Sequence, residues 1–200
     1  NCRICRGSLK KIIDLGKIAL VGNFFKKKKK LKKFKISLNF CKNCKHVQIS
    51  EVINPNLLFK NYLWETGVSK SNMYLIKSVI KNLEKFKINQ NSKVLEIASN
   101  DGSLINSINK KFKCFTVGVD PAKNLKKIVN KKNILSLIEY FNYKLSIKLK
   151  KKFNKFNFII ARNVLAHVPD PNEIFKGVNI LLDNNGIFVL EVPHLENIIN

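Results

Sequence analysis

The chain has 200 residues, of which 45% are hydrophobic, so a packed core is feasible and the composition argues against wholesale disorder. Its 38 basic and 13 acidic residues give a formal net charge of +25, a balance that ordinarily points to nucleic acid or an anionic surface. The basic residues are almost all lysine, with Arg3, Arg6 and Arg162 as the arginines. Lys, Asn and Ile are abundant together, as is typical of AT-rich coding, so the charge is weak evidence for a polyanionic partner.

The chain carries no sign of membrane insertion or secretion. No apolar run approaches the roughly 20 residues needed to cross a bilayer, and no charged n-region followed by an apolar h-region opens the sequence. We therefore expect a cytoplasmic protein without a membrane partner. Because the sequence begins at Asn1 and ends shortly after a strand-like run, we interpret it as the N-terminal fragment of a longer protein.

Four of the five cysteines form two C-x2-C pairs, Cys2 with Cys5 and Cys41 with Cys44. Two such pairs can surround one zinc ion as a tetrahedral four-sulfur site. Such a site leaves no open coordination position, so the zinc would be structural. The alternative is two disulfides, which need an oxidising compartment. We expect Cys114, which lies in a strand-like run, to be a core residue.

Residues 26–35, between the two pairs, read KKKKKLKKFK. The run could bind phosphate groups or form a solvated loop. Its lack of arginine and its few aromatic residues favour the solvated loop. The long gap between the pairs predicts a loop or small hairpin, and we expect His46 to be a surface residue because four cysteines complete the site.

Downstream, the hydrophobic pattern changes twice. An aromatic-rich stretch at 57–71 is followed by helical spacing that predicts an amphipathic helix; its apolar residues are Leu75, Ile76, Val79, Ile80 and Leu83. From residue 93 strand-like and helix-like segments alternate, which predicts a parallel, doubly wound α/β sheet. The predicted strands are 93–98, 115–119, 134–137, 157–161 and 187–192. Ligands of such sheets bind at the carboxyl ends of the strands.

Two helices of this region have clear starting signals. One begins near Leu104, after the turn 100–102. The other begins at Asp170, a favoured N-cap, with Pro171 at the first helical position. We expect the second helix to bury five residues, Ile174, Phe175, Val178, Leu181 and Leu182, and a turn at 183–186 to lead into the last strand.

The loop after the first predicted strand reads Glu96-x-Ala98-x-Asn100-x-Gly102. This is the spacing of the acidic-x-Gly-x-Gly-x-Gly loop of S-adenosylmethionine (SAM) methyltransferases, with only the last glycine kept. An exposed Asp101 here would repel a pyrophosphate and attract a methionine ammonium group, which favours SAM over NAD. The alternative for Asn100 and Asp101 is an ordinary turn and helix cap.

Asp120 ends the second predicted strand, where a carboxylate can accept both ribose hydroxyls of a nucleoside. Its alternative role is to cap the chain before Pro121. Arg162, after the fourth strand, could contact an anionic group or lie on the surface.

These segments together resemble the nucleotide-sugar C-methyltransferases. The resemblance rests on the two cysteine pairs and on a set of short segments: LFKNYLW, VLEIASNDG, GVDPA, ARNVLAHVPD and EVP. It implies a small four-cysteine zinc-binding domain (1–60), a connecting aromatic segment and helix (61–91), and an incomplete Rossmann-like class I methyltransferase sheet (92–200).

The resemblance also implies a set of site residues. Zinc would be held by Cys2, Cys5, Cys41 and Cys44. SAM would be held by Glu96, Ala98, Ser99, Asn100, Asp101, Gly102, Asp120 and Asn163. The active-site histidine of the family corresponds to His167, and its Tyr-x-Tyr segment corresponds to Tyr62-Leu63-Trp64, so Tyr62 is the candidate catalytic tyrosine.

The implied reaction is methyl transfer from SAM to a carbon, carbon 3, of a nucleotide-linked 4-keto-6-deoxysugar through an enolate. The resemblance also implies a general base in a Tyr-x-Glu-His motif, which we expect beyond Asn200. Three other functions are open: a zinc-ribbon module that binds nucleic acid through the lysine run, an NAD-dependent oxidoreductase, and a methyltransferase of another acceptor. Since the charge is weak evidence, we expect a small-molecule substrate and no nucleic-acid partner.

Overall fold

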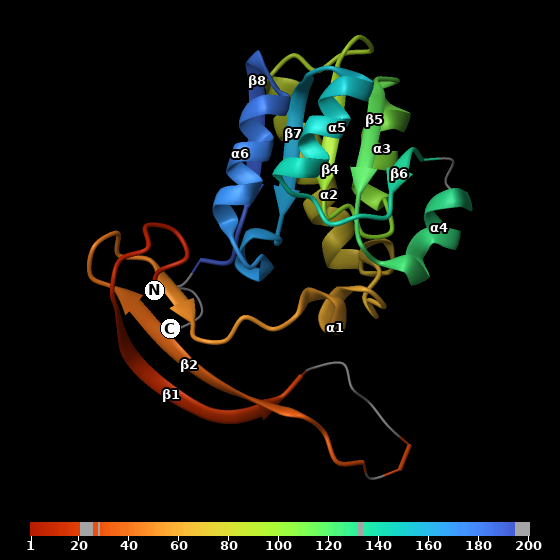
Figure 1. Ribbon diagram of the computed structural model, residues 1–200. Helices are drawn as coiled ribbons and strands as arrows, with labels where there is room; N and C mark the ends of the chain where they lie inside the picture. The colour runs from red at the N-terminus through yellow and green to blue at the C-terminus, as the bar shows by residue number, and fades with distance from the viewer. Residues whose placement is uncertain (21–25, 28, 132–133, 195–200) are drawn as a thin grey trace.

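The computed structural model describes residues 1–20, 26–27, 29–131 and 134–194 (Figure 1). Its strands are β1 (Leu9–Ala19), β2 (Lys33–Cys41), β3 (Val47–Ile49), β4 (Lys93–Ile97), β5 (Phe115–Val119), β6 (Ser136–Leu137), β7 (Phe156–Arg162) and β8 (Leu182–Glu191). Its α-helices are α1 (Pro55–Phe59), α2 (Lys70–Lys85), α3 (Ser103–Phe112), α4 (Lys126–Lys131), α5 (Tyr143–Phe153) and α6 (Pro171–Leu181). Short 3-10 helices are η1 (Thr66–Val68), η2 (Lys123–Leu125) and η3 (Leu165–His167).

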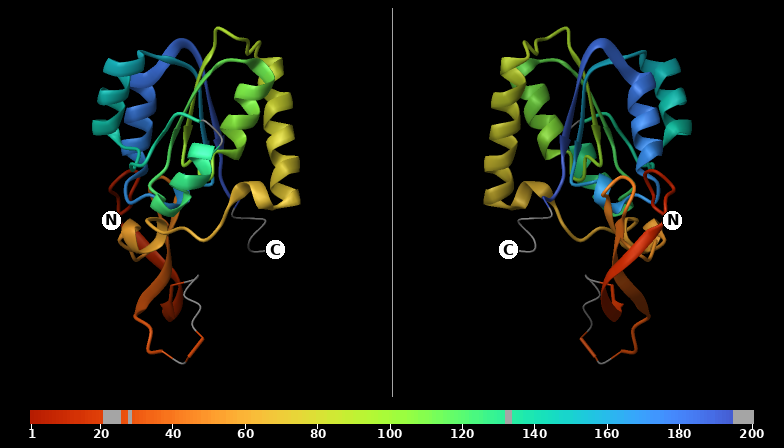
Figure 2. Two further views of the ribbon diagram at one scale, coloured as in Figure 1. Left: turned by 90° about the vertical axis from the view of Figure 1, so that its right-hand side faces the viewer. Right: turned by 90° about the vertical axis from the view of Figure 1, so that its left-hand side faces the viewer.

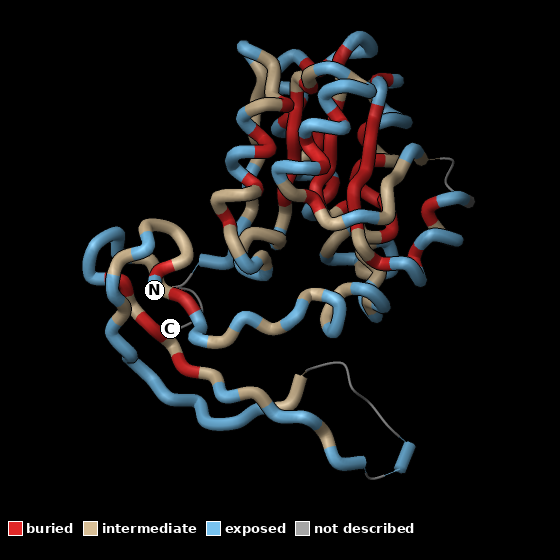
Figure 3. The backbone as a smooth tube through the Cα atoms, in the orientation of Figure 1, coloured by how far each residue is buried: buried red, intermediate tan, exposed pale blue. Residues whose placement is uncertain are grey.

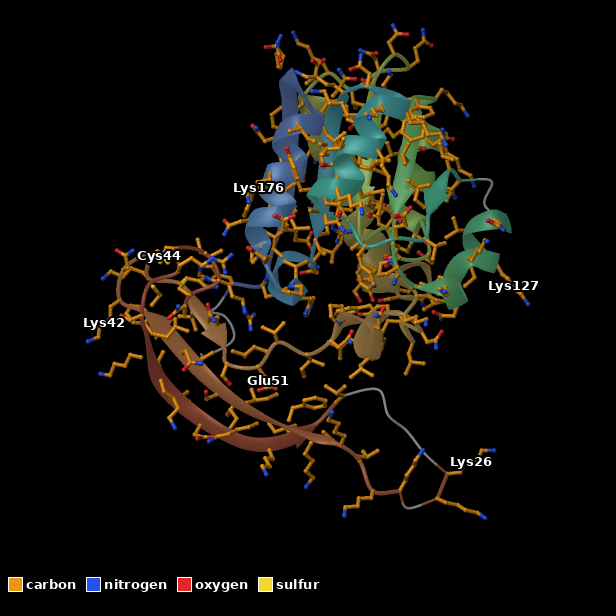
Figure 4. All side chains as sticks on the ribbon, viewed as in Figure 1. Lys26, Lys42, Cys44, Glu51, Lys127 and Lys176 are labelled. Carbon is orange, nitrogen blue, oxygen red and sulfur yellow. The ribbon has the colours of Figure 1, made fainter. Side chains whose placement is uncertain are left out.

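The N-terminal part is a three-stranded antiparallel sheet in the order β1-β2-β3. The predicted hairpin between the cysteine pairs is present, and β1 and β2 form its two long arms (Figure 1). Exposed Lys26, near the hairpin tip, and Cys44 lie at opposite ends of this sheet (Figure 4). Of the predicted lysine-rich loop, Lys28 lies outside the described residues.

This small sheet has no apolar core. Among the described residues up to position 50, the buried ones are Cys2, Ser37, Asn39, Cys41 and Gln48, and the hairpin is exposed along most of its length (Figure 3). Burial of aliphatic side chains therefore cannot be what holds it together, which leaves the cysteine cluster as its stabilising centre.

The second part confirms the α/β prediction. Five parallel strands form one sheet in the order β6-β5-β4-β7-β8. Helices α2 and α3 cover one face, and α5 and α6 cover the other (Figure 2). Successive residues of a strand point to opposite faces, so Val94 packs with α2 and α3 whereas Leu95 packs with α5 and α6.

The register brings the carboxyl ends of the three central strands to one edge. Ile97 of β4 pairs with Val119 of β5 and with Ala161 of β7. The loops that follow these three strands therefore meet, as the alternating pattern predicted.

Several local predictions hold. Asp170 caps α6, because its Oδ1 accepts the backbone N–H of Asn172 at 3.0 Å. Cys114 is a core residue with 1% exposure. Helix α2 covers the predicted amphipathic segment and buries Ile76, Ile80 and Leu83.

Other predictions fail locally. Phe175 is 41% exposed, because its ring packs edge-on against Phe188 of the edge strand β8 instead of in the central core. Leu182, expected in the same helix, is instead the half-buried first residue of β8. The turn predicted at 183–186 is instead an irregularity within β8: Phe156 pairs with Leu182, and Phe158 pairs with Ile187. No helix in the described part of the chain has the length and apolar character to cross a bilayer.

Candidate functional site

A cavity of about 250 Å³ opens at the carboxyl ends of β4, β5 and β7. Its floor comes from the loops after these strands, and its opposite side comes from α1, the segment after it and η3. Of the candidate SAM and catalytic residues, those that line it are Tyr62, Glu96, Ala98, Ser99, Asn100, Asp120, Asn163 and His167. One open cavity thus brings together residues from positions 62 to 167.

The loop after β4 keeps a glycine-like backbone at all three glycine positions of the motif. Ala98, Asn100 and Gly102 have φ angles of 60°, 52° and 73°, in the left-handed region. Asparagine tolerates this region better than most residues, and alanine tolerates it at a cost. The spacing of the motif therefore reflects a backbone shape that persists although two of its glycines are absent.

Asp120 is fixed at the end of β5 by two backbone N–H groups. Its Oδ2 accepts from Asn100 and its Oδ1 from Ala122, both at 2.8 Å. The carboxylate lines the cavity although the residue is only 8% exposed, and this burial raises its pKa. Each oxygen retains a second lone pair, so the group can still accept hydrogen bonds from a ligand. The capping alternative and the ligand-binding role are thus compatible.

Glu96 has a buried carboxyl group, one oxygen of which lacks a hydrogen-bond partner among the described residues. The residue is 5% exposed, and the unpartnered oxygen is Oε2. Burial raises its pKa to about 8, against the opposing charge of Arg162. The hydroxyl of Ser99, also at the cavity, is likewise buried without a described partner. Unpaired buried polar atoms are costly, so both atoms favour a polar ligand in this cavity.

Asp101 was expected to be exposed, and this is wrong. The residue is 2% exposed and does not line the cavity. Its Oδ1 accepts the backbone N–H of Ser103 at 3.0 Å, and its Oδ2 accepts that of Gly67 at 3.0 Å. The reversal of the backbone at Asn100 and Gly102 turns this carboxylate inward to the start of α3 and to η1. Gly102 also stays off the cavity surface, and its absent Cβ would lie 2.7 Å from Ile134 Cδ1.

Asn100 joins the loop after β4 to the aromatic segment. Its Oδ1 accepts the Thr66 backbone N–H at 2.9 Å, and its Nδ2 donates to the Trp64 carbonyl oxygen at 2.9 Å. The segment 64–67 is thereby held over the loop after β4. Trp64, the second aromatic of the expected tyrosine pair, is 71% exposed and does not line the cavity.

Three rings that line the cavity form a row, which we call the aromatic wall: Tyr62, Phe59 and His167. The Phe59 ring lies 5.8 Å from that of Tyr62 and 5.7 Å from that of His167, between centroids. Partial burial raises the pKa of Tyr62 and lowers the pKa of His167. His167 is therefore mainly a neutral imidazole at pH 7, and Tyr62 keeps its hydroxyl proton.

Arg162 and Asn163 are organised by Glu191 of β8. The Glu191 carboxylate accepts Arg162 Nε at 2.7 Å and Asn163 Nδ2 at 2.7 Å. The Arg162 side chain is only 10% exposed and lines the cavity, so its alternative as a surface residue is wrong. Sequence reasoning assigned no role to Glu191, although an acidic residue at a strand's carboxyl end was the signal that identified Asp120.

A second residue that the sequence did not reveal is Tyr140. It lines the cavity, and its hydroxyl donates to Asn56 Oδ1 at 3.1 Å. Burial raises its pKa. It lies in an irregular segment between β6 and α5, where neither periodicity nor a motif marks a site residue.

The four cysteines Cys2, Cys5, Cys41 and Cys44 form one cluster, with all sulfurs within 4.8 Å of one another. Cys2 Sγ lies 3.6 Å from Cys44 Sγ, and Cys5 Sγ lies 3.5 Å from Cys41 Sγ. Tetrahedral zinc with bonds of about 2.3 Å separates its sulfurs by about 3.8 Å. The donor set and its spacing fit zinc, and the sulfurs are too far apart for disulfides.

Two matching turns build the cluster. Cys2 N–H donates to the Gly7 carbonyl and Cys41 N–H donates to the His46 carbonyl, each at 2.8 Å. A Cβ on Gly7 would lie 3.2 Å from Cys5 Sγ, so glycine leaves room for the sulfurs. His46 contributes no ligand atom to this cluster. Hydrogen bonding, first from Gly7, lowers the pKa of Cys5 to about 6.

Comparison with known proteins agrees with both parts. Residues 2–59 match a family model described as "Putative zinc binding domain". Residues 71–198, more than half of the chain, match one described as "Methyltransferase domain".

One curated relative is "C-methyltransferase NovU" from Streptomyces niveus, 26% identical over 98% of this chain and 47% of the relative. The chain thus spans about half the length of the curated relative it matches. Among solved structures, a "putative sarcosine dimethylglycine methyltransferase" from Galdieria sulphuraria superimposes with a TM-score of 0.50 at 16% identity. That superposition covers 60% of this chain and 46% of the other, and it shows a shared fold.

Proposed function

Because this chain belongs to the family of methyltransferase domains, we propose that its cavity binds SAM for methyl transfer to a carbon atom. SAM is the cofactor of this class I fold, and the N-terminal domain is a zinc-binding domain. We further propose that the acceptor is carbon 3 of a nucleotide-linked 4-keto-6-deoxysugar. The relative named as a C-methyltransferase supports transfer to carbon.

The observation that carries the SAM assignment is the pair of buried carboxyl groups at the cavity floor. Asp120 is held with both oxygens turned to backbone N–H groups and still has lone pairs for ribose hydroxyls. Glu96 offers an unpartnered Oε2 to the ammonium of the methionine moiety. Ser99 supplies a further unpartnered hydroxyl. An ammonium group beside Glu96 favours the ionised form of its carboxyl group, and the Asp120 carboxylate would repel a pyrophosphate. These polar atoms therefore fit a zwitterionic nucleoside better than a pyrophosphate.

When bound, SAM supplies an electrophilic methyl group. Methylation of carbon beside a ketone requires a base to take the neighbouring proton, which puts negative charge on the ketone oxygen. We assign that proton to the base of the Tyr-x-Glu-His motif that the family resemblance implies, and not to a residue of this cavity. A neutral His167 can donate one N–H to that oxygen, and the Tyr62 hydroxyl can donate another. Both groups belong to the aromatic wall and line the same cavity as Asp120. In this proposal the wall holds the acceptor, and the floor holds the cofactor.

We also propose the following division of the chain. Residues 1–60 form the zinc-binding domain, 61–91 connect it, and 92–200 form the SAM-binding domain of a cytoplasmic enzyme. The packing of α2 against the five-stranded sheet supports a connector that is in close contact with the SAM-binding domain.

Calorimetric titration of the zinc-loaded chain tests the function. We expect SAM to bind and NAD not to bind. The complex with S-adenosylhomocysteine is then titrated with dTDP-4-keto-6-deoxyglucose, with dTDP as the control ligand. Failure of a folded sample to bind SAM would overturn the cofactor assignment. SAM binding without sugar-nucleotide binding would point instead to another acceptor.

A further inference from the structure

The turn that carries the first two cysteines also contacts the domain that holds the cavity. This turn, residues 2–7, is closed by hydrogen bonds from Cys2 N–H to the Gly7 carbonyl and from Arg6 N–H to the Cys2 carbonyl. The carbonyls of Arg3 and Ile4, between the two ligands, accept Nδ2 of Asn172 at 3.2 and 3.1 Å. Arg6 forms an ion pair with Asp170. Both partners belong to the first turn of α6, more than 160 residues away.

The segment reached by these contacts leads directly to His167. Asp170 and Asn172 follow His167, Val168 and Pro169, which all line the cavity. Pro169 and Pro171 fix their own φ angles and restrict the residues before them. The backbone between His167 and α6 therefore has little conformational freedom. A displacement of the α6 N-terminus should displace His167 as well.

Residues 2–7 also contact the chain segment that leads to Phe59 of the aromatic wall. Arg3 Nη2 donates to the carbonyls of Ile49 and Glu51, at 2.9 and 3.1 Å. These residues end the three-stranded sheet and lead into α1, which carries Phe59. The Phe59 and His167 rings meet 5.7 Å apart. The turn thus holds both chain segments whose rings form the wall.

We infer that Asn172 and Arg6 are positioning residues through which the zinc-binding turn sets the Phe59–His167 part of the aromatic wall. The inference rests on the proposed function, in which this wall holds the acceptor. It gives the zinc a role beyond holding its own sheet together. Of the two contacts the Asn172 amide is the stronger, because the Arg6 side chain is 64% exposed and surface ion pairs contribute little.

The cofactor side of the cavity is independent of these contacts. Asp120, Ala98 and Asn100 are fixed by bonds among themselves, to Val119 and Ala122, and to the segment 64–66. Loss of the Asn172 and Arg6 contacts should therefore disturb the aromatic wall and leave the affinity for SAM unchanged. General destabilisation would affect both sides together.

The test compares the wild-type chain with Arg6→Met/Asn172→Ala and with the control Asn179→Ala, an exposed position on the same helix. Zinc content, the Kd for SAM and the NMR titration of the His167 imidazole are measured for each. We expect one zinc and an unchanged Kd in all three. Only in the double variant should the lowered pKa of His167 rise toward 6.5, because the loosened wall admits water.

A His167 titration identical to the wild type would overturn the inference, as would a loss of SAM affinity alongside the change at His167. If the wild type itself bound no SAM, the proposed function would fail, a result distinct from either. Should the double variant not fold, Asn172→Ala alone carries the same test. Alanine is favoured in helices, so the single substitution removes the amide without weakening α6.

Discussion

The Asp120 carboxylate accepts the backbone N–H of Asn100 at 2.8 Å, and this bond joins the end of β5 to the loop after β4. The bond holds Asn100 in a left-handed conformation that would otherwise be unfavourable. Asp120 therefore has two roles: it shapes the loop and it presents acceptor lone pairs to the cavity. The same carboxylate that would bind the ribose also fixes the loop around it.

Asp120→Asn should weaken SAM binding by about 5- to 150-fold. The amide NH2 group that replaces one oxygen cannot accept from the Asn100 N–H or from a ribose hydroxyl, a loss of about 1–3 kcal/mol. Calorimetry gives the Kd, and thermal unfolding separates binding from stability. Asp14→Asn, on the exposed hairpin, is the control and should leave the Kd unchanged. If Asp120→Asn bound SAM with the wild-type affinity, the role of Asp120 in SAM binding would be refuted.

Ala98→Gly should stabilise the protein by up to about 1.5 kcal/mol. Alanine at φ 60° is strained by about 1–2 kcal/mol, from which the greater entropy of an unfolded glycine must be subtracted. The matched control is Ala122→Gly, where φ is −71° and the same change should cost about 0.5–1 kcal/mol. Denaturant unfolding measures both. Equal destabilisation by the two substitutions would contradict a strained loop.

Glu96→Gln should make stability less dependent on pH. Burial raises the pKa of Glu96 from 4.5 to about 8 in the folded state, so the folded protein holds a proton that the unfolded chain releases above pH 4.5. The wild type therefore loses stability as pH rises from about 5 to 8, by at most about 1.4 kcal/mol per pH unit. Glutamine mimics the protonated acid and does not titrate.

The measurement is the free energy of unfolding of both proteins from pH 5 to 8. The advantage of Glu96→Gln should grow with pH across this window and then level off. A difference that stays constant with pH would mean that Glu96 is already ionised in the folded protein, for example through the nearby charge of Arg162.

Cys44→Ser should abolish zinc binding and unfold the three-stranded sheet, because that sheet buries almost no aliphatic side chains. The five-stranded sheet has its own two apolar clusters and should remain folded. Zinc content and amide NMR spectra check this. Cys114→Ala is the control: it removes a buried thiol from the other domain and should leave one zinc per chain. Retention of the small sheet without zinc would contradict the prediction.

The sequence by itself determined the elements whose signals are local. Alternation of strand-like and helix-like segments predicted the parallel sheet. Asp170 and Pro171 marked the start of α6. One metal site was predicted from the spacing of four cysteines, Cys2, Cys5, Cys41 and Cys44. These features follow from periodicity, capping and ligand geometry within short stretches of chain. They need no knowledge of which distant residue lies opposite.

Only the tertiary structure decided the features that depend on distant partners. Asp101 is buried because Gly67 and Ser103 donate to it, and Arg162 faces the cavity because Glu191 holds it there. Ala98 and Asn100 adopt a glycine-like backbone because the surrounding packing and hydrogen bonds offset its cost. The contact of Asn172 with the zinc-binding turn joins residues at opposite ends of the chain. Local sequence sets what each of these residues can do, and long-range packing selects which partner it meets.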